Sequence, residues 1–161
     1  FSFTGIYVAP GASSNPTPSY AAQATPVIFN KDNTTAFQLH SYAAALQSFN
    51  YDNANQVVYR ELVQGTKEVL ITERSPNGSV TIEAPGLGTK DYFAIANTSG
   101  STGNLTFQHG QTTGNKVTLT LGQTDLQGPT YSDSEGVAML NIGYTATPTT
   151  AGNNEFSLKF H

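Results

Sequence analysis

The 161-residue sequence contains no cysteine and few charged residues. The absence of cysteine excludes a disulfide framework of the kind that stabilises small secreted scaffolds. No apolar run approaches the ~18 residues that a membrane-spanning helix needs. Charged residues make up only 11% of the chain, its net charge is −4, and the seven lysines and arginines lie scattered. Because no basic stripe is present to neutralise phosphates, tight binding to nucleic acid is not expected.

Motifs for catalysis, cofactors and metals are also absent. The sequence has no G-x-S-x-G elbow, no P-loop and no G-x-G-x-x-G fingerprint. His40, His109 and His161 are far apart and lack partners at metal-ligand spacing, and His109 continues the apolar face of its strand as a half-buried structural histidine. Residues 133–136 lack the full calcium-loop pattern, so a polar turn is the better interpretation. We therefore expect no enzymatic activity, no cofactor and no metal site.

Residues 57–84 contain three segments rich in strand-forming residues, separated by the sequences QGTK and SPNG. Alternation along each segment, such as Val57 and Tyr59 on one side of the first, indicates strands with one buried and one wetter face. In the second connection Pro76 fixes φ and Asn77-Gly78 tolerates positive φ, so the chain can reverse tightly there. These features predict a three-stranded antiparallel meander around which the rest of the chain is organised.

The remaining sequence predicts more strands of the same kind. Threonine, valine, isoleucine, tyrosine and phenylalanine favour strands, and 15 glycines and 8 prolines punctuate them. Further strands are expected at residues 35–40, 46–51, 105–109, 116–121 (continued by a bulge toward 129), 137–147 and 156–160. About eight strands with turns every ~10 residues predict a mainly β fold, an antiparallel β-sandwich or barrel.

One short helix is expected to flank these strands, at residues 89–97. Thr89 is its predicted N-cap, and packing must hold so short a helix. Tyr92, Ile95 and Ala96 fall on one side at spacings of three and four, with Phe93 at the flank. Tyr92, Phe93 and Ile95 are therefore the candidate residues for helix packing or for assembly.

The first 26 residues differ from the rest. Residues 1–8 alternate like a strand, whereas residues 9–26 carry four prolines among alanine, serine and glycine and predict a linker or extended arm. Residues 27–161 form the predicted β domain. The chain begins with Phe1 and shows no signal-peptide pattern, which we interpret as a fragment or a processed product.

Several segments resemble the tail tube proteins of long-tailed bacteriophages and prophages. The likeness spans about residues 45–160 and rests on strand and turn motifs, at residues 55–62, 69–74, 78–83, 90–97, 109–110, 114–117, 129–136 and 151–156. It involves no catalytic signature. The resemblance implies a β-sandwich with one flanking helix, similar also to the tube protein of the type VI secretion machine.

The resemblance also implies a function. Members of this family are virion structural proteins (major tail proteins) that self-assemble in the bacterial host cytoplasm into stacked rings, next to other tail proteins, and form the channel for DNA ejection. DNA would pass through the lumen without sequence-specific binding, and no membrane is involved. Some members carry two tandem copies of the fold, so residues 1–8 resemble the terminal strand of a preceding domain and the chain resembles a C-terminal half.

Two other classes stay open at this point. A carbohydrate-binding or adhesive β-sandwich of a surface protein would need a patch of exposed aromatics, which the eight tyrosines could supply. A hydrolase would need catalytic residues dispersed along the sequence.

Overall fold

Ten strands and one helix form between residues 36 and 160 of the part that the computed structural model describes, which comprises residues 4–12, 14, 16–19 and 25–161. The predicted strand at residues 1–8 lies partly outside these ranges. The elements are β1 (Ala36–Leu39), β2 (Tyr42–Ala43), β3 (Leu46–Asp52), β4 (Gln56–Glu61), β5 (Lys67–Glu73), β6 (Asn77–Glu83), α1 (Tyr92–Asn97), β7 (Thr102–His109), β8 (Val117–Ser134), β9 (Val137–Ala146) and β10 (Ser157–Phe160).

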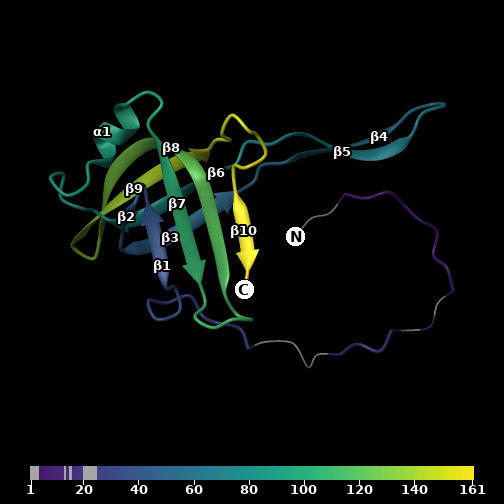
Figure 1. Cartoon of the computed structure of the whole chain (residues 1–161), viewed down its shortest axis with the longest axis horizontal. Helices are drawn as coiled ribbons and strands as arrows, with labels where there is room; N and C mark the ends of the chain where they lie inside the picture. Colours follow the sequence, from purple (N-terminus) through teal and green to yellow (C-terminus); the bar gives the residue numbers. More distant parts are fainter. Residues whose placement is uncertain (1–3, 13, 15, 20–24) are drawn as a thin grey trace.

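Eight of the strands form one antiparallel sheet, in the order β2-β1-β7-β8-β9-β6-β3, with β10 added to β8. The 18-residue strand β8 belongs to both halves of this sheet. Its first part pairs with β7 and β10, and its second part pairs with β9, with a register shift between Gln127 and Thr130. Because β8 bends, the two halves face each other (Figure 1). The prediction of a mainly β, antiparallel sandwich or barrel with one short helix is therefore confirmed.

The core lies between the two halves of the sheet. Leu39, Leu105 and Leu121 from one half and Ile82 from the other are fully enclosed. Burial of each such side chain contributes about 1.5–3 kcal/mol. An aromatic layer also crosses the core, because Phe49 of β3 stacks on Phe107 of β7 with ring centroids 5.0 Å apart.

The predicted three-stranded meander is wrong. Strands β4 and β5 pair only with each other, as a separate two-stranded sheet, whereas β6 pairs with β3 and β9 in the main sheet. Figure 1 shows the β4–β5 ribbon extending away from the body. The predicted strand boundaries hold to within about two residues. The error concerns the partners, which alternation within a strand does not specify.

The tight turn predicted at Asn77-Gly78 is also wrong, since both residues belong to β6. Glycine is needed there for a different reason. A Cβ atom at Gly78 would collide with the backbone oxygen of Asn50 and the hydroxyl of Tyr144. That hydroxyl donates a hydrogen bond of 2.6 Å to the same Asn50 oxygen. Gly78 thus leaves room for the Tyr144 side chain of β9 to cross β6 and reach the backbone of β3.

The helix begins three residues later than predicted, and its N-cap is Asp91 rather than Thr89. The Asp91 side chain accepts a hydrogen bond of 2.9 Å from the amide of Ala94, as a capping carboxylate does. Thr89 instead donates its backbone N–H to the Gly86 carbonyl oxygen in the preceding turn.

Candidate assembly surface

The described ranges contain no group of three or more histidine, aspartate or glutamate side chains that could hold a metal ion. The three histidines lie at separate places and make structural contacts. His109 is half-buried, its ring lies within 3.1 Å of the Val27 carbonyl oxygen and 3.2 Å of the Thr34 hydroxyl, and it stacks on Phe29. No helix among the described residues is long and apolar enough to cross a membrane.

His40 is the most enclosed of the three histidines. Its Nε2 atom lies 3.0 Å from the Thr124 carbonyl oxygen and 3.1 Å from the Thr124 hydroxyl. Because that hydroxyl donates to the Gly103 carbonyl oxygen, Nε2 carries the hydrogen and donates to Thr124. Burial lowers the pKa of His40, and the nearby Lys90 ammonium lowers it further. The neutral ring is a fixed part of the β1–β2 turn rather than a base in an open site.

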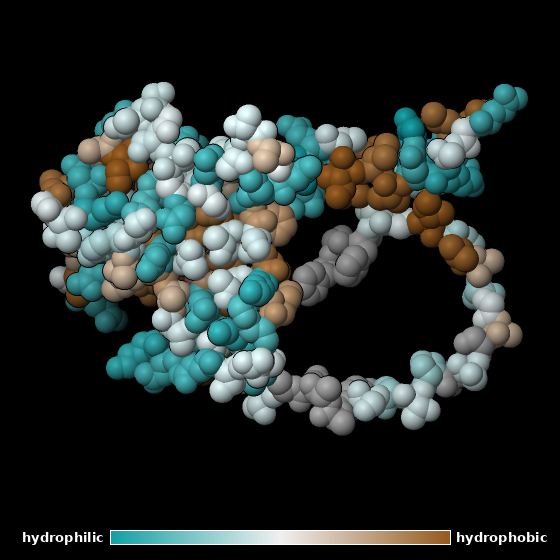
Figure 2. All heavy atoms as spheres, in the orientation of Figure 1, coloured by the Kyte–Doolittle hydropathy of each residue, from teal (hydrophilic) through white to brown (hydrophobic). Residues whose placement is uncertain are grey.

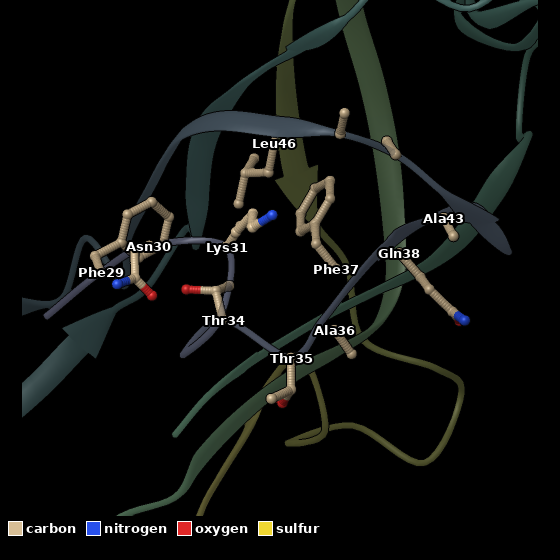
Figure 3. Close-up of a pocket in the computed structure, with 12 residues that line it drawn as sticks. Phe29, Asn30, Lys31, Thr34, Thr35, Ala36, Phe37, Gln38, Ala43 and Leu46 are labelled. Atoms are coloured by element: carbon tan, nitrogen blue, oxygen red, sulfur yellow. The ribbon is translucent and has the colours of Figure 1, made fainter. Parts of the chain in front are cut away.

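A cleft of about 710 Å³ lies between the segment that leads into β1 and the start of β3. Figure 3 shows Phe37 and Leu46 pointing toward its centre, with Lys31 beside them and Phe29 at one end. The lining is apolar and polar side chains with a single charged group, Lys31. No acid–base pair or nucleophile with a neighbouring base lines it, so the cleft has no arrangement for chemistry.

The structure brings the three helix residues against the body. Tyr92 is fully buried and its hydroxyl donates a hydrogen bond of 3.1 Å to the Leu39 carbonyl oxygen. Phe93 and Ile95 are partly buried and pack against the core, and Phe93 lies 5.1 Å from the ring of Tyr131. The three side chains therefore pack the helix onto the sheet. Their predicted role in assembly stays a prediction.

The β4–β5 hairpin is the most unusual surface of the described chain. Val57, Val58 and Tyr59 are each more than 40% exposed, and Val63 at the tip is 97% exposed. Figure 2 shows hydrophobic side chains along the part of the hairpin nearer the body and hydrophilic ones toward its end. A two-stranded ribbon is marginally stable alone, and a projecting apolar ribbon marks an interaction site. We therefore identify the hairpin as the candidate functional surface.

Both faces of the hairpin are apolar, because directly paired residues share a face. Tyr59 pairs with Val69 on one face, and Val58 pairs with Leu70 on the other. The hairpin therefore offers a contact to partners on both sides.

Ion pairs join the two strands next to the tip. Glu61 lies 2.7 Å from Lys67, and Arg60 pairs with Glu68. The Lys67 ammonium lowers the pKa of Glu61, which also accepts a hydrogen bond of 2.6 Å from the Tyr59 hydroxyl. These pairs hold the strand register where few packed side chains are available.

An ion pair anchors the base of the hairpin to the loop before β10. Arg74 Nε lies 3.1 Å from Oε1 of Glu155, and the Arg74 guanidinium also donates to Asn153. Glu155 is buried, so this pair is less screened than the two near the tip. Next to it, the ring of Phe156 contacts Tyr51, whose pKa is raised to about 12 by burial and by the Glu155 carboxylate.

Strand β10 forms the second exposed apolar feature of the body. Leu158 lies opposite Leu119 and Phe160 lies opposite Val117, so both point to the inner face of the sheet. Leu119 is buried, whereas Leu158 is 49% and Phe160 is 73% exposed. The apolar inner face of the sheet thus extends onto β10, and the other half of the sheet does not cover it there.

The sequence contained a signal for the hairpin that alternation alone did not reveal. Val57-Val58 and Val69-Leu70-Ile71 are apolar at consecutive positions. Consecutive apolar residues indicate a strand that needs cover on both faces. The Arg74–Glu155 pair joins positions 81 residues apart and has no local signal.

Sequence comparisons find no matching protein family and no matching curated protein. Comparison of the structure does find solved relatives. One is a chain from the cryo-EM structure of the anti-feeding prophage cap, described as the cap that terminates the AFP tube, with a TM-score of 0.57, 12% identity, and coverage of 88% of this chain and 99% of that one. Another comes from the tail of the empty GTA particle with C6 symmetry, with a TM-score of 0.49, 16% identity, and coverage of 83% and 99%. The chain therefore shares the fold of a subunit from a prophage tube cap.

Proposed function

We propose that this chain is a structural tail protein of a bacteriophage or phage-derived particle, and that its copies stack in rings to form the tail tube. The observation that carries the proposal is the projecting hairpin, which is apolar on both faces and exposed along β4, at the tip and at Ile71 of β5. Monomeric proteins rarely expose a contiguous apolar surface of this kind, and such surfaces mark contacts with other proteins. The shared fold with the prophage tube cap, over nearly the whole of that chain, supports the same assignment.

In this proposal the chain is not an enzyme and its mechanism is architectural. Contacts between copies cover the hairpin, and strands of neighbouring copies pair so that no sheet edge is left free. DNA passes through the lumen without sequence-specific binding, and a net charge of −4 with few lysines leaves few sites where a polyanion would be held. The location is the virion tail, assembled in the host cytoplasm.

We also propose that residues 1–8 are the terminal strand of a preceding domain of the same fold, joined by residues 9–26. Ile6, Tyr7 and Val8 are strand-forming and exposed. In the described ranges the segment before β1 forms no helix or strand. These observations support a partner for residues 6–8 outside the body of this domain.

A carbohydrate-binding or adhesive module is the alternative. It calls for several aromatic rings in one exposed patch. The exposed tyrosines of the described chain, Tyr7, Tyr59 and Tyr131, lie in three separate segments. No specific observation favours this alternative over assembly.

Electron microscopy and light scattering test the proposal. The chain and a version extended by the preceding domain are compared in one buffer. We expect the chain to be a monomer or a weak oligomer, and the extended version to form hollow tubes. An extended version that stays monomeric at high concentration and high salt would contradict the tube assignment. Regular tubes from the chain alone would contradict the duplication and leave the tube assignment intact.

A further inference from the structure

The backbone of β10 offers one unpaired edge. The amide of His161 donates a hydrogen bond of 2.9 Å to the Lys116 carbonyl oxygen, and β10 runs antiparallel to β8. Bonds to one neighbour alternate along an antiparallel strand, so Leu158 and Phe160 direct their N–H and C=O groups away from β8. In the described part of the chain no strand pairs with β10 on that side.

The two faces of this edge differ in chemistry. Leu158 and Phe160 form the apolar inner face. Lys159 and His161 lie on the outer face with Lys116 close by, and the His161 pKa is lowered by burial and then by these two ammonium groups. Within the described ranges neither lysine has an acidic side chain at ion-pair distance. A strand that fits here is apolar on one face and acidic on the other.

Strand β5 of the hairpin has an apolar face and an acidic group on the opposite face. Val69 and Ile71 lie on one face, and Glu68 lies beside Leu70 on the other, where Glu68 is only partly exposed and pairs with Arg60. The outer edge of β5 is unpaired in the described chain. Because the hairpin extends away from the body (Figure 1), its own β10 is not the strand that it meets, and the partner is a second copy.

One register satisfies both faces. In an antiparallel arrangement Ile71 lies opposite Leu158 and Val69 opposite Phe160, so Glu68 lies opposite His161 and diagonal to Lys159. A parallel arrangement of the same apolar residues also leaves Glu68 diagonal to Lys159 but places it opposite Ser157, at the far end of β10 from Lys116. The antiparallel register therefore brings the Glu68 carboxylate nearest to both ammonium groups, and opposite charges across an interface select the partner and its register.

We propose that β5 of one copy adds antiparallel to the free edge of β10 in a second copy. This inference rests on the proposed function, because it takes contact between copies as given and names the strands that make it. Addition of a strand to an exposed edge is a recurring mode of protein recognition. It pairs the two free edges and places Ile71 and Val69 beside Leu158 and Phe160 on one face of the extended sheet.

Disulfide trapping tests the pairing directly, because the chain has no cysteine of its own. Ser157 and Thr72 form a pair without mutual hydrogen bonds in the proposed register, which brings their side chains close enough for a disulfide. Ser157→Cys and Thr72→Cys are made in separate preparations of the version extended by the preceding domain, mixed, assembled and oxidised. Ser157→Cys mixed with Leu70→Cys is the matched control, because Leu70 lies two residues further along β5. We expect a band at twice the chain mass with Thr72→Cys and little with Leu70→Cys.

The outcomes separate this inference from the proposed function. A Thr72-specific band in tubes supports both. Tubes without that band overturn the strand pairing and leave the tube assignment intact. The band in concentrated solution without any tubes supports the pairing and contradicts the tube assignment. Neither band nor tubes overturns both.

A second pair of variants tests the backbone contact. Leu158→Ala and Leu158→Pro both remove the apolar side chain, but only proline removes the N–H that faces the free edge. We expect weaker assembly for Leu158→Pro than for Leu158→Ala, with circular dichroism spectra of the two dispersed proteins unchanged. Equal assembly of the two would overturn the pairing.

Discussion

The β6–β9 pair and the β4–β5 pair are both antiparallel and rich in apolar residues, yet their environments are opposite. Val80 and Ile142 lie opposite each other and are buried. Val57 and Ile71 also lie opposite each other and are exposed. The difference lies in what covers the strands, since residues of β1 and β7 belong to the same core cluster as Val80 and Ile142, whereas no described residue of β4 or β5 belongs to it. A strand with apolar side chains on both faces is therefore expected to be buried by packing, and the packing surface can belong to another copy of the chain.

The largest effect is expected for Gly78→Ala, within the packed body. The added methyl group meets backbone and a buried tyrosine at once, and neither can move freely. We expect a loss of about 3 kcal/mol or more, the upper range for overpacking, or a failure to fold. Gly88→Ala is the control, because its Cβ would meet nothing within 4 Å. Urea denaturation measures both, and equal stabilities would contradict this account of β6.

The two strand pairs are compared most directly by Leu105→Ala and Val58→Ala. Leu105 is fully buried, so its truncation should cost about 2–5 kcal/mol in the free energy of unfolding. Val58 is 45% exposed in the hairpin, so the cost in the dispersed chain should stay within about 0.5 kcal/mol. Chemical denaturation below the assembly concentration gives both values. A large loss for Val58→Ala would show that the hairpin is packed within its own chain.

Tyr92→Phe tests how firmly the helix is held. The variant keeps the buried ring and removes the hydroxyl that donates to the Leu39 carbonyl oxygen. We expect a loss of about 1–2 kcal/mol, because a buried acceptor is left unpaired. Unchanged stability in thermal denaturation would mean that the hydrogen bond is replaced by solvent.

A pH titration tests the buried His40. Its pKa in the folded chain lies below the ordinary value of 6.5, because burial disfavours the charged ring. The folded chain therefore binds this proton less readily than the unfolded chain, and its stability is complete above pH 6.5 and falls as the pH drops toward the folded pKa. His40→Asn, which tolerates the positive φ at this position, should lessen that dependence. Identical pH profiles for the two proteins would contradict the buried neutral ring.

The sequence predicted strands β3 and β9 of the body well, because each has one covered face. Strands β3 and β9 lie within a residue or two of their predicted positions, since their apolar residues alternate as their burial does. The bulge within β8 was also expected from its glycine and proline. Strand type is a local property that period-two alternation specifies.

The partners of the strands could not be predicted in the same way. Strand β6 joins β3 and β9 instead of β5, through contacts between positions far apart in sequence. The β1–β2 turn uses His40-Ser41, both at positive φ, without the glycine or asparagine that signals such turns. The Thr124 contacts of His40 and the Lys90 hydrogen bond to its carbonyl oxygen hold this turn, and they come from other segments.

The candidate site was hidden for the same reason. The spacing of apolar residues along the short helix identified Tyr92, Phe93 and Ile95, and these side chains pack on the core. Alternation within each strand places the hairpin in the body of the sheet, although its consecutive apolar residues indicate that both of its faces need to be covered. The apolar surface that stays exposed depends on the pairing of all the strands, which no single segment of sequence specifies.

Removal of the hairpin tests the central claim most directly. Gln56 and Glu73 lie opposite each other, so an Asn-Gly turn can replace residues 57–72 and leave Arg74 and its ion pair in place. Light scattering and electron microscopy then compare this variant with the intact protein, each extended by the preceding domain. We predict a melting temperature within about 2–4 °C of the intact protein, the shift that ~1 kcal/mol produces, together with loss of assembly. Tubes formed as readily without the hairpin would contradict the account.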